Sequence, residues 1–502
     1  MHLQENILCA TAPSSPNSGP GTISLHDIQT GTILASFKHT TAAPHCTTFL
    51  ESRNTQGGFI LASQPDKSIL NVYTFQKDQI SLKIVLPEKL TCISLDPKGN
   101  FCAGGTAQGR IHLWEVSSGI LYNSWDAHYR QVSILRFTRD GHALLSGSED
   151  SGVSVWAVSR LLDDDLQNDL PVPYCTLSDH TLPITDIICG VGPFPNCRVL
   201  TSSVDHSVKL WDLSSRSLLT TFQFPQPISC LTWDLTERVF LAASEDGSIH
   251  QMNLFRQRTP DTGTPVAEAI GGAGINDIIR VGEDQEARKK RLISVGDPIT
   301  ALAISLTSSL LLVGTSTGLV HVYDLPSHQL LRTISTHKGF TITHLASIIK
   351  PLDLIGHISL HINFSNAADV KDMIPIKPIL PFQRMRDPKR RETHEVSILL
   401  PLKKYMENEI SNYQMEELLQ DYAFFIRPSS PTSTPNNDDI PLEDKITSLE
   451  EEVKRLRDQL GKAKTINDTM WDTMIQNAMD QAGRKDIADA DEGDKRRKRG
   501  RT

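Results

Sequence analysis

The sequence predicts an all-β fold in which seven four-stranded units form a closed ring, followed by a helical C-terminal extension. Three observations support this prediction. A short motif, in which alternating apolar residues lead to a Trp, recurs most clearly at Trp114, Trp156 and Trp211. Short runs of alternating apolar and polar residues surround each recurrence, as is typical of antiparallel strands. Beyond residue 441, apolar residues instead recur at spacings of three and four, as is typical of a coiled coil.

The repeat has a period near forty residues. Positions equivalent to the Trp are 26, 73, 114, 156, 211, 252 and 323, and the intervals are 47, 41, 42, 55, 41 and 71 residues. Because three intervals are 41 or 42, the longer ones indicate the same unit with inserted loops. In the unit that starts at His128, four candidate strands lie at Val132 to Phe137, Ala143 to Gly147, Gly152 to Trp156 and around Pro173 to Leu177.

Two units contain a His, a Ser, an Asp and a Trp at matching positions. We expect the Asp to hold the His, whose second ring nitrogen meets the Ser hydroxyl and through it the indole N–H, so that all buried polar groups are paired. The sets are His128, Ser148, Asp150 and Trp156, and His180, Ser203 or Ser202, Asp205 and Trp211. Asp246 keeps the spacing in a unit where Met252 replaces the Trp. On these residues the chain resembles the WD-repeat β-propeller family, which implies a seven-bladed WD-repeat β-propeller.

These Ser, His and Asp residues could also be taken for a hydrolase triad. The set recurs once per unit, however, whereas an active site would occur once. His39 and His337 occupy the His position in degraded units, and the same structural interpretation holds for them. We therefore expect a protein that is not an enzyme and that needs no cofactor. A propeller enzyme would need a non-repeating polar set at the central channel, and the sequence shows none.

The first unit begins too late to contain all four strands, since Ile7 to Ala10 already has the pattern of a second strand. The apolar run from Thr341 to Ile349 has the pattern of a first strand and is followed by no Trp-type turn. We therefore predict that this run completes the first blade, which pairs the two ends of the ring and leaves no exposed sheet edge there.

The remaining chain divides by composition. The predicted segments are the propeller at 1–350, with insertions at 160–173 and 256–292, an extended Pro-rich segment at 351–402, an amphipathic helix at 403–426, a disordered linker at 427–441, a coiled coil at 442–482 and a charged tail at 483–502. The first insertion is acidic but lacks EF-hand spacing, which favours a solvated loop over a metal site. We interpret the second insertion as a flexible excursion. The Pro-rich segment and the helix are expected to pack on the propeller or on a partner.

The coiled coil has a heptad pattern over more than four heptads, with Glu and Lys or Arg at the other positions. Its predicted interface residues are Ile446, Leu449, Val453, Leu456, Leu460, Asn467 and Met470. The single Asn467 favours a parallel two-stranded register, because two buried amides pair only when they are aligned. A homodimer through this segment is the expected state.

Charge is unevenly distributed. The net charge is −9, but residues 495 to 501 contain six cations, which leaves −15 for the rest of the chain. The acidic body argues against a surface that coats nucleic acid. The basic run predicts a nuclear localisation signal, with RNA contact as a second interpretation. Its residues are Lys495, Arg496, Arg497, Lys498 and Arg499. No apolar run is long enough for a membrane span, so we expect no membrane partner.

The order of these parts, with Ile466-Asn467-Asp468-Thr469-Met470-Trp471 in the coiled coil, resembles the fungal WD-repeat subunit of the nuclear complex that matures precursors of the large ribosomal subunit. The resemblance implies a non-catalytic scaffold required for removal of internal transcribed spacer 2 and for maturation and export of the pre-60S particle. It also implies two partners, a helical-repeat scaffold subunit of the same complex and a dynein-like ATPase. The resemblance further implies a link to DNA replication licensing at chromatin.

The sequence is also compatible with another class of binding protein. A propeller rim is a general platform, and a fold does not determine a function. The alternative is therefore a substrate receptor of a ubiquitin ligase or a chromatin adaptor.

Overall fold

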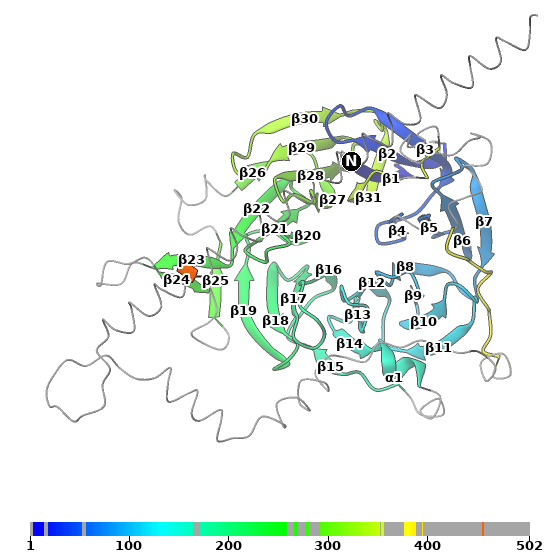
Figure 1. Cartoon of the computed structure of the whole chain (residues 1–502). Coiled ribbons are helices and arrows are strands. Elements are labelled where there is room, and N and C mark those ends of the chain that lie inside the picture. Colours follow the sequence, from blue (N-terminus) through cyan, green and yellow to red (C-terminus); the bar gives the residue numbers. More distant parts are fainter. Residues whose placement is uncertain are drawn as a thin grey trace, which may run out of the picture. The chain divides into compact units, whose positions relative to one another are not determined.

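The computed structural model describes residues 4–14, 19–52, 57–163, 171–258, 266–269, 277–281, 292–351, 353–355, 376–387, 394 and 454–455. It forms two compact units, Met1–Asn412 and Tyr413–Thr502. In the second unit only Lys454 and Arg455 are described, and both are helical. The first unit is a ring of seven antiparallel sheets around a central axis (Figure 1). The seven-bladed all-β fold expected from the repeat is therefore confirmed.

Each blade has four strands, named here from the innermost outward. Blade 1 contains β31 (Phe340–Ile349), β1 (Glu5–Pro13), β2 (Gly21–Asp27) and β3 (Ile33–Thr40). Blade 2 contains β4 (Thr47–Leu50), β5 (Phe59–Gln64), β6 (Ile69–Thr74) and β7 (Ile80–Val85). Blade 3 contains β8 (Leu90–Leu95), β9 (Phe101–Thr106), β10 (Arg110–Glu115) and β11 (Leu121–Asp126). Blade 4 contains β12 (Val132–Phe137), β13 (Ala143–Ser148), β14 (Val153–Ala157) and β15 (Cys175–Leu177).

The other three blades follow the same order. Blade 5 contains β16 (Ile184–Cys189), β17 (Arg198–Ser203), β18 (Ser207–Asp212) and β19 (Ser217–Gln223). Blade 6 contains β20 (Ile228–Trp233), β21 (Val239–Ser244), β22 (Ser248–Asn253) and β26 (Leu292–Ser294). Blade 7 contains β27 (Ile299–Ile304), β28 (Leu310–Thr315), β29 (Val320–Asp324) and β30 (Leu330–Ile334).

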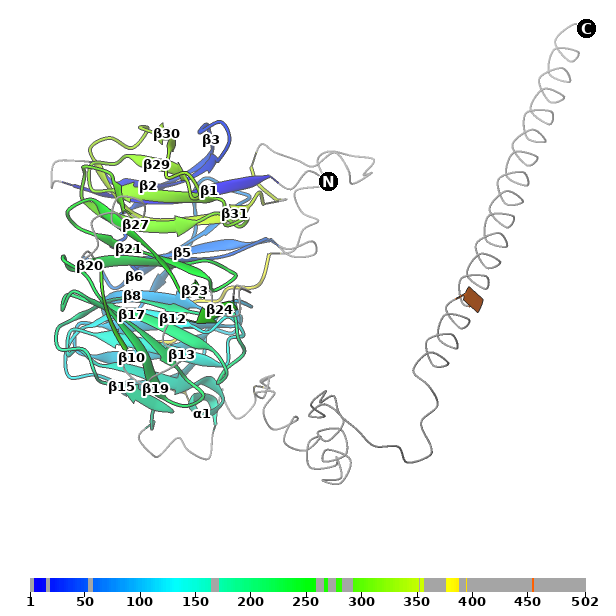
Figure 2. The same ribbon diagram turned by 90° about the vertical axis from the view of Figure 1, so that its left-hand side faces the viewer.

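Blade 1 closes the ring. β31 pairs antiparallel with β1 from Glu5 opposite Ile349 to Pro13 opposite Phe340, and β1 in turn pairs with β2. The two strands lie side by side in both views (Figure 2). The predicted pairing of the ends of the ring is thus confirmed. Because β31 fills the innermost place of blade 1, the ring has no unpaired strand edge at the junction.

Both insertions contain regular structure. A short helix, α1 (Val158–Leu162), follows β14 and buries its apolar side chains between blades 3 and 4. In the second insertion, β23 (Phe255–Arg258) pairs with β24 (Val266–Ala269), and β25 (Asp277–Arg280) joins β19 in parallel as a fifth strand of blade 5. The expectation of a flexible excursion is therefore wrong for these strands, because the outer edge of β19 offers backbone groups that β25 can pair with.

Hydroxyl groups tie the innermost strands of neighbouring blades together. In β8, β12, β16, β20 and β27 the register shifts by one residue near the start of the strand, and a Ser or Thr occupies the shifted position. Each hydroxyl donates to a backbone carbonyl of the next blade, as in Thr91 to Val132 (2.6 Å), Thr185 to Ile228 (2.7 Å) and Thr300 to Ile342 (2.6 Å). The bulges therefore set both the blade spacing and the walls of the central channel.

Candidate functional site

The polar network of blade 4 joins two strands, the turn between them and the loop before β12. His128 Nδ1 lies 3.1 Å from Asp150 Oδ2, and His128 Nε2 lies 2.8 Å from Ser146 Oγ. The indole N–H of Trp156 donates to the same hydroxyl at 3.0 Å. Asp150 also accepts the backbone N–H of Gly152 at 2.9 Å, which holds the tight turn between β13 and β14. The network thus anchors the loop before β12 to the interior of its own blade.

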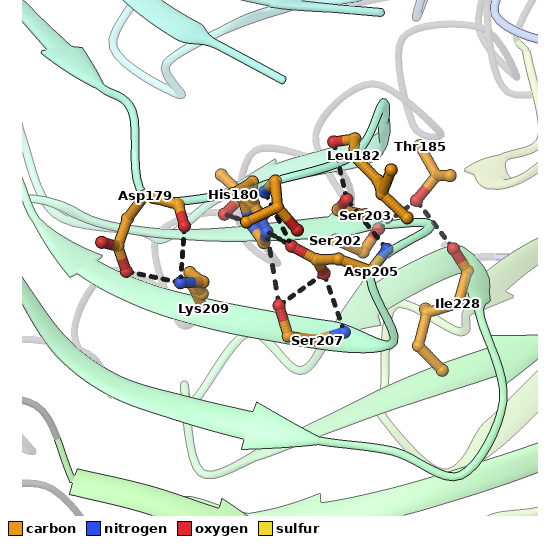
Figure 3. A network of polar contacts seen from close by, with 12 residues as sticks. Asp179, His180, Leu182, Thr185, Ser202, Ser203, Asp205, Ser207, Lys209 and Ile228 are labelled. Atoms are coloured by element: carbon orange, nitrogen blue, oxygen red, sulfur yellow. Dashed lines mark hydrogen bonds and ion pairs between the residues drawn. The ribbon is translucent and has the colours of Figure 1, made fainter.

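Blade 5 repeats this arrangement. His180 contacts Asp205 Oδ2 at 2.9 Å and Thr201 Oγ1 at 2.8 Å, and Trp211 donates to Thr201 at 2.9 Å. Ser207 adds a hydrogen bond to Asp205, 2.6 Å long (Figure 3). Beside this set, the Lys209 ammonium pairs with Asp179. The predicted His, Asp and Trp therefore belong to one network within each blade. These residues are His128, Asp150 and Trp156 in blade 4, and His180, Asp205 and Trp211 in blade 5.

The hydroxyl member of the network differs from the prediction. Ser148 donates to the backbone carbonyl of Arg130 and accepts the Asp150 N–H, and Ser203 does the same with Leu182 and Asp205. Ser202 contacts Thr185 at 2.8 Å. The groups that meet His and Trp are Ser146 and Thr201, two residues earlier in β13 and β17. The residues next to the turn bond to the turn itself, whereas only a residue deeper in the strand can reach the indole.

Burial and hydrogen bonding define the charge of this network. Burial lowers the pKa of His128 below its ordinary value, even though Asp150 acts in the opposite direction. Burial would raise the pKa of Asp205, but hydrogen bonds from His180 and Ser207 outweigh it and hold that pKa well below its usual range. Each hydroxyl already contacts both an imidazole and an indole. These Ser, Thr, His and Asp groups therefore act as blade anchors rather than as a catalytic triad.

The degraded blades replace this polar set with other groups. In blade 6 Asp246 accepts from the backbone and hydroxyl of Ser248, but the positions of the His and the hydroxyl are occupied by Phe224 and Ala242, beside Met252. Asp246 therefore organises its turn without holding a histidine. In blade 1 His337 lies 2.8 Å from His26 and 3.0 Å from Ser24.

Blade 2 uses the backbone of the histidine rather than its ring. The hydroxyl of Tyr73, which occupies the Trp position, donates to the carbonyl of His39 at 3.2 Å. The expectation that the His39 ring takes part in the network is therefore not met by this contact, which uses the backbone carbonyl of His39.

Blade 3 is completed by a segment distant in sequence, residues 376–387, here called the strap. The ring of Phe382 stacks on Trp114 with centroids 5.2 Å apart, and the Trp114 indole donates to the carbonyl of Gln383 at 3.0 Å. Backbone hydrogen bonds join Leu380 to Val116 (3.2 Å) and Gln383 to Gly119 (2.7 Å). The sequence predicts that the Pro-rich segment packs either on the propeller or on a partner, and residues 376–387 pack on the propeller. No periodic pattern marks it in the sequence.

A cavity of about 440 Å³ lies at the end of the central channel where the innermost strands end. Its lining includes four titratable groups from four different blades, which are His45, Arg136, Asp186 and His344. Arg136 Nη2 lies 3.7 Å from Asp186 Oδ1. Burial lowers the pKa of His344 to about 3, and Arg136 and His45 act in the same direction. No pattern in the sequence marks this cluster, because its members occur once each rather than once per repeat.

Several predicted features fall outside the described residues. These are the acidic residues 164–170 of the first insertion, the amphipathic helix at 403–426, the linker, the predicted coiled-coil interface and the basic run at 495–499. Within the described ranges, no group of three or more His, Cys, Asp or Glu side chains could hold a metal ion. The same part of the chain contains no helix with the length and hydropathy to cross a membrane.

Comparisons with known proteins agree with this architecture. The profile of the family "WD domain, G-beta repeat" matches residues 119–157 and 171–212, which contain both complete networks. The chain is 32% identical to "Pre-rRNA-processing protein IPI3" of Mycosarcoma maydis, over 84% of this chain and 86% of that protein. It is 29% identical to the protein of that name in Yarrowia lipolytica, over 89% of this chain and 95% of the relative.

The likeness extends to animals. Human "WD repeat-containing protein 18" is 32% identical, over 66% of this chain and 70% of the human protein. The match to the Mycosarcoma maydis protein spans more than the propeller, since it covers most of both chains. From this identity, this coverage and the seven-bladed architecture, the chain belongs to the family of the pre-rRNA-processing protein IPI3 and WD repeat-containing protein 18.

Proposed function

We propose that this protein is a non-catalytic scaffold in the processing of rRNA precursors. The observation that carries the proposal is its similarity, along most of the chain, to relatives named for pre-rRNA processing. The site geometry supports it, because the repeated Ser, His and Asp groups serve as blade anchors and leave the rim of the propeller as a platform for other molecules. Such a role places the protein in the nucleus, where the basic run at 495–499 would direct it.

The finer assignment follows the family resemblance. The protein would act in removal of internal transcribed spacer 2 and in maturation and export of the pre-60S particle. Its partners would be a helical-repeat scaffold subunit and a dynein-like ATPase, with rRNA as a further contact. Depletion of the protein should cause precursors that retain this spacer to accumulate, as measured by hybridisation with a spacer probe. Normal precursor levels after complete depletion would contradict the proposal. The DNA content of the same cells tests the replication link.

The ubiquitin-ligase and chromatin alternative makes a different prediction. Affinity purification of the full chain from nuclear extract should recover ribosome-assembly factors together with precursor rRNA. Recovery of ligase or chromatin subunits in their place would favour the alternative. No described contact favours it over the processing role.

Homodimerisation is a separate proposal that rests on the heptad pattern at 442–482. A Leu449→Cys variant should form a disulfide-linked dimer under oxidising conditions if the helices are parallel and in register. A matched Glu451→Cys variant, at a position outside the predicted interface, should crosslink much less. Monomer in both cases would contradict a parallel homodimer.

A further inference from the structure

Two residues that line the cavity in the central channel have a buried side-chain nitrogen without a hydrogen-bond partner among the described residues. The Nε atom of Arg136 is buried and has no hydrogen-bond partner among the described residues, and neither has Nε2 of His344. The one carboxylate beside them, Asp186, already accepts the backbone N–H groups of Ile187 and Leu231, each at 2.9 Å. Native structures pair more than about nine in ten buried polar groups, so two unpaired groups at one cavity suggest an absent acceptor.

The position of Arg136 makes the arrangement suited to a ligand. Arg136 lies near the end of β12, and Arg139 follows in the exposed turn. Both line the cavity. The Arg136 side chain is 44% exposed although its Nε is buried, so the guanidinium faces the open end of the channel. A guanidinium forms its strongest hydrogen bonds with carboxylate or phosphate groups, because its planar fork can bind both oxygens.

The remaining lining favours a peptide carboxylate over nucleic acid. Apolar side chains surround the opening, and two of them, Leu235 and Leu306, are 42% and 39% exposed. The lining contains two arginines and no lysine. Single-stranded nucleic acid binds along extended, positively charged grooves that contact several successive phosphates. The cavity does not form such a groove. Its volume of about 440 Å³ lies in the usual range for ligand sites, about 300–1,000 Å³.

We propose that this end of the central channel binds an acidic peptide segment of a partner protein, with a Glu or Asp side chain paired with Arg136 and apolar neighbours against Leu235 and Leu306. The inference does not depend on the role in rRNA processing, since it concerns binding alone. His45 lines the same cavity, and burial lowers the pKa of its ring. A bound carboxylate would also offer an acceptor to His344.

The test uses the full chain and two fluorescent peptide libraries measured by anisotropy. Both libraries are capped nonapeptides with randomised apolar positions, and they differ only in a central Glu or Gln. The Glu library should bind wild-type protein about tenfold more tightly than the Gln library, and Arg136→Gln should remove that difference. The matched control is Arg130→Gln, which changes an exposed arginine in the loop before β12 and should bind like wild type.

Other results would overturn the proposal. These are equal binding of the two libraries to wild type, unchanged Glu binding by Arg136→Gln, or Arg136-dependent binding of a 12-nucleotide single-stranded RNA in preference to the peptides. Thermal melting of each variant checks folding. If Arg136→Gln melts early, Arg139→Gln replaces it, since this exposed residue should weaken Glu binding without disturbing the core.

Discussion

The indole nitrogen of Trp114 donates to the backbone carbonyl of Gln383, although the two residues are 269 positions apart. In the other two blades with a Trp at the repeat position, blades 4 and 5, the indole donates to a hydroxyl of its own blade. Blade 3 has Gly104 at that hydroxyl position, and Leu86 at the His position. Leu86, Trp114 and Phe382 share one apolar cluster. The strap therefore supplies the acceptor for the Trp114 indole that blade 3 itself lacks.

The first prediction concerns this contact. Replacing Phe382, which is 4% exposed, with Ala should lower the free energy of unfolding by about 3–5 kcal/mol, because a buried aromatic ring leaves the cluster. Urea unfolding followed by tryptophan fluorescence measures the change. Met385→Ala, at a strap position that is 81% exposed, should change it by less than about 0.5 kcal/mol. Equal effects of the two substitutions would mean that the strap is not anchored by Phe382.

The second prediction separates Ser146 from Ser148. Ser146→Ala removes the acceptor of Trp156 and leaves the His128 ring without its second partner, so unfolding should become easier by about 1–3 kcal/mol. Ser148→Ala is the matched control, since Ser148 bonds only to the backbone around the turn. Its effect should be smaller. If Ser148→Ala were the more damaging change, the assignment of the network hydroxyl would be wrong.

The third prediction tests the hydroxyl ties between blades. Thr300→Val keeps the shape of the side chain but removes the hydrogen bond to Ile342 in blade 1, which should cost about 1–2 kcal/mol of stability. The control is Thr307→Val, at an exposed hydroxyl in a turn of the same blade. Chemical denaturation of both variants provides the comparison. Indistinguishable midpoints would argue against a role for the ties in stability.

The fourth prediction uses His112, whose ring nitrogens are both buried without a partner among the described residues. Burial lowers its pKa from 6.5 to about 4. As the pH falls through this range, the unfolded chain binds a proton that the folded chain excludes, so stability is lost. His112→Phe should stabilise the protein, and more at pH 5 than at pH 8, by up to about 1.4 kcal/mol per pH unit. An identical pH dependence of the two proteins would contradict this.

Sequence and structure agree on most of the features that repeat. The period, the strands of blade 4 and the His, Asp and Trp positions follow from patterns that occur several times. The repeat pattern cannot separate Ser148 from Ser146, because both residues lie on the same face of β13 and only the register with Trp156 distinguishes them. The strap and the channel cluster have no repeat to reveal them. Their residues meet only after the ring has closed.

The pairing of β1 with β31 also has a consequence for synthesis on the ribosome. Cys9 lies opposite Leu345, so β1 leaves the ribosome long before its innermost neighbour is made. At about 5–20 residues per second, the edge of β1 waits roughly 20–70 s for its partner. During that time it presents unpaired backbone groups to other nascent chains. A chain truncated before residue 340 would keep this edge of β1 unpaired, so we expect it to aggregate.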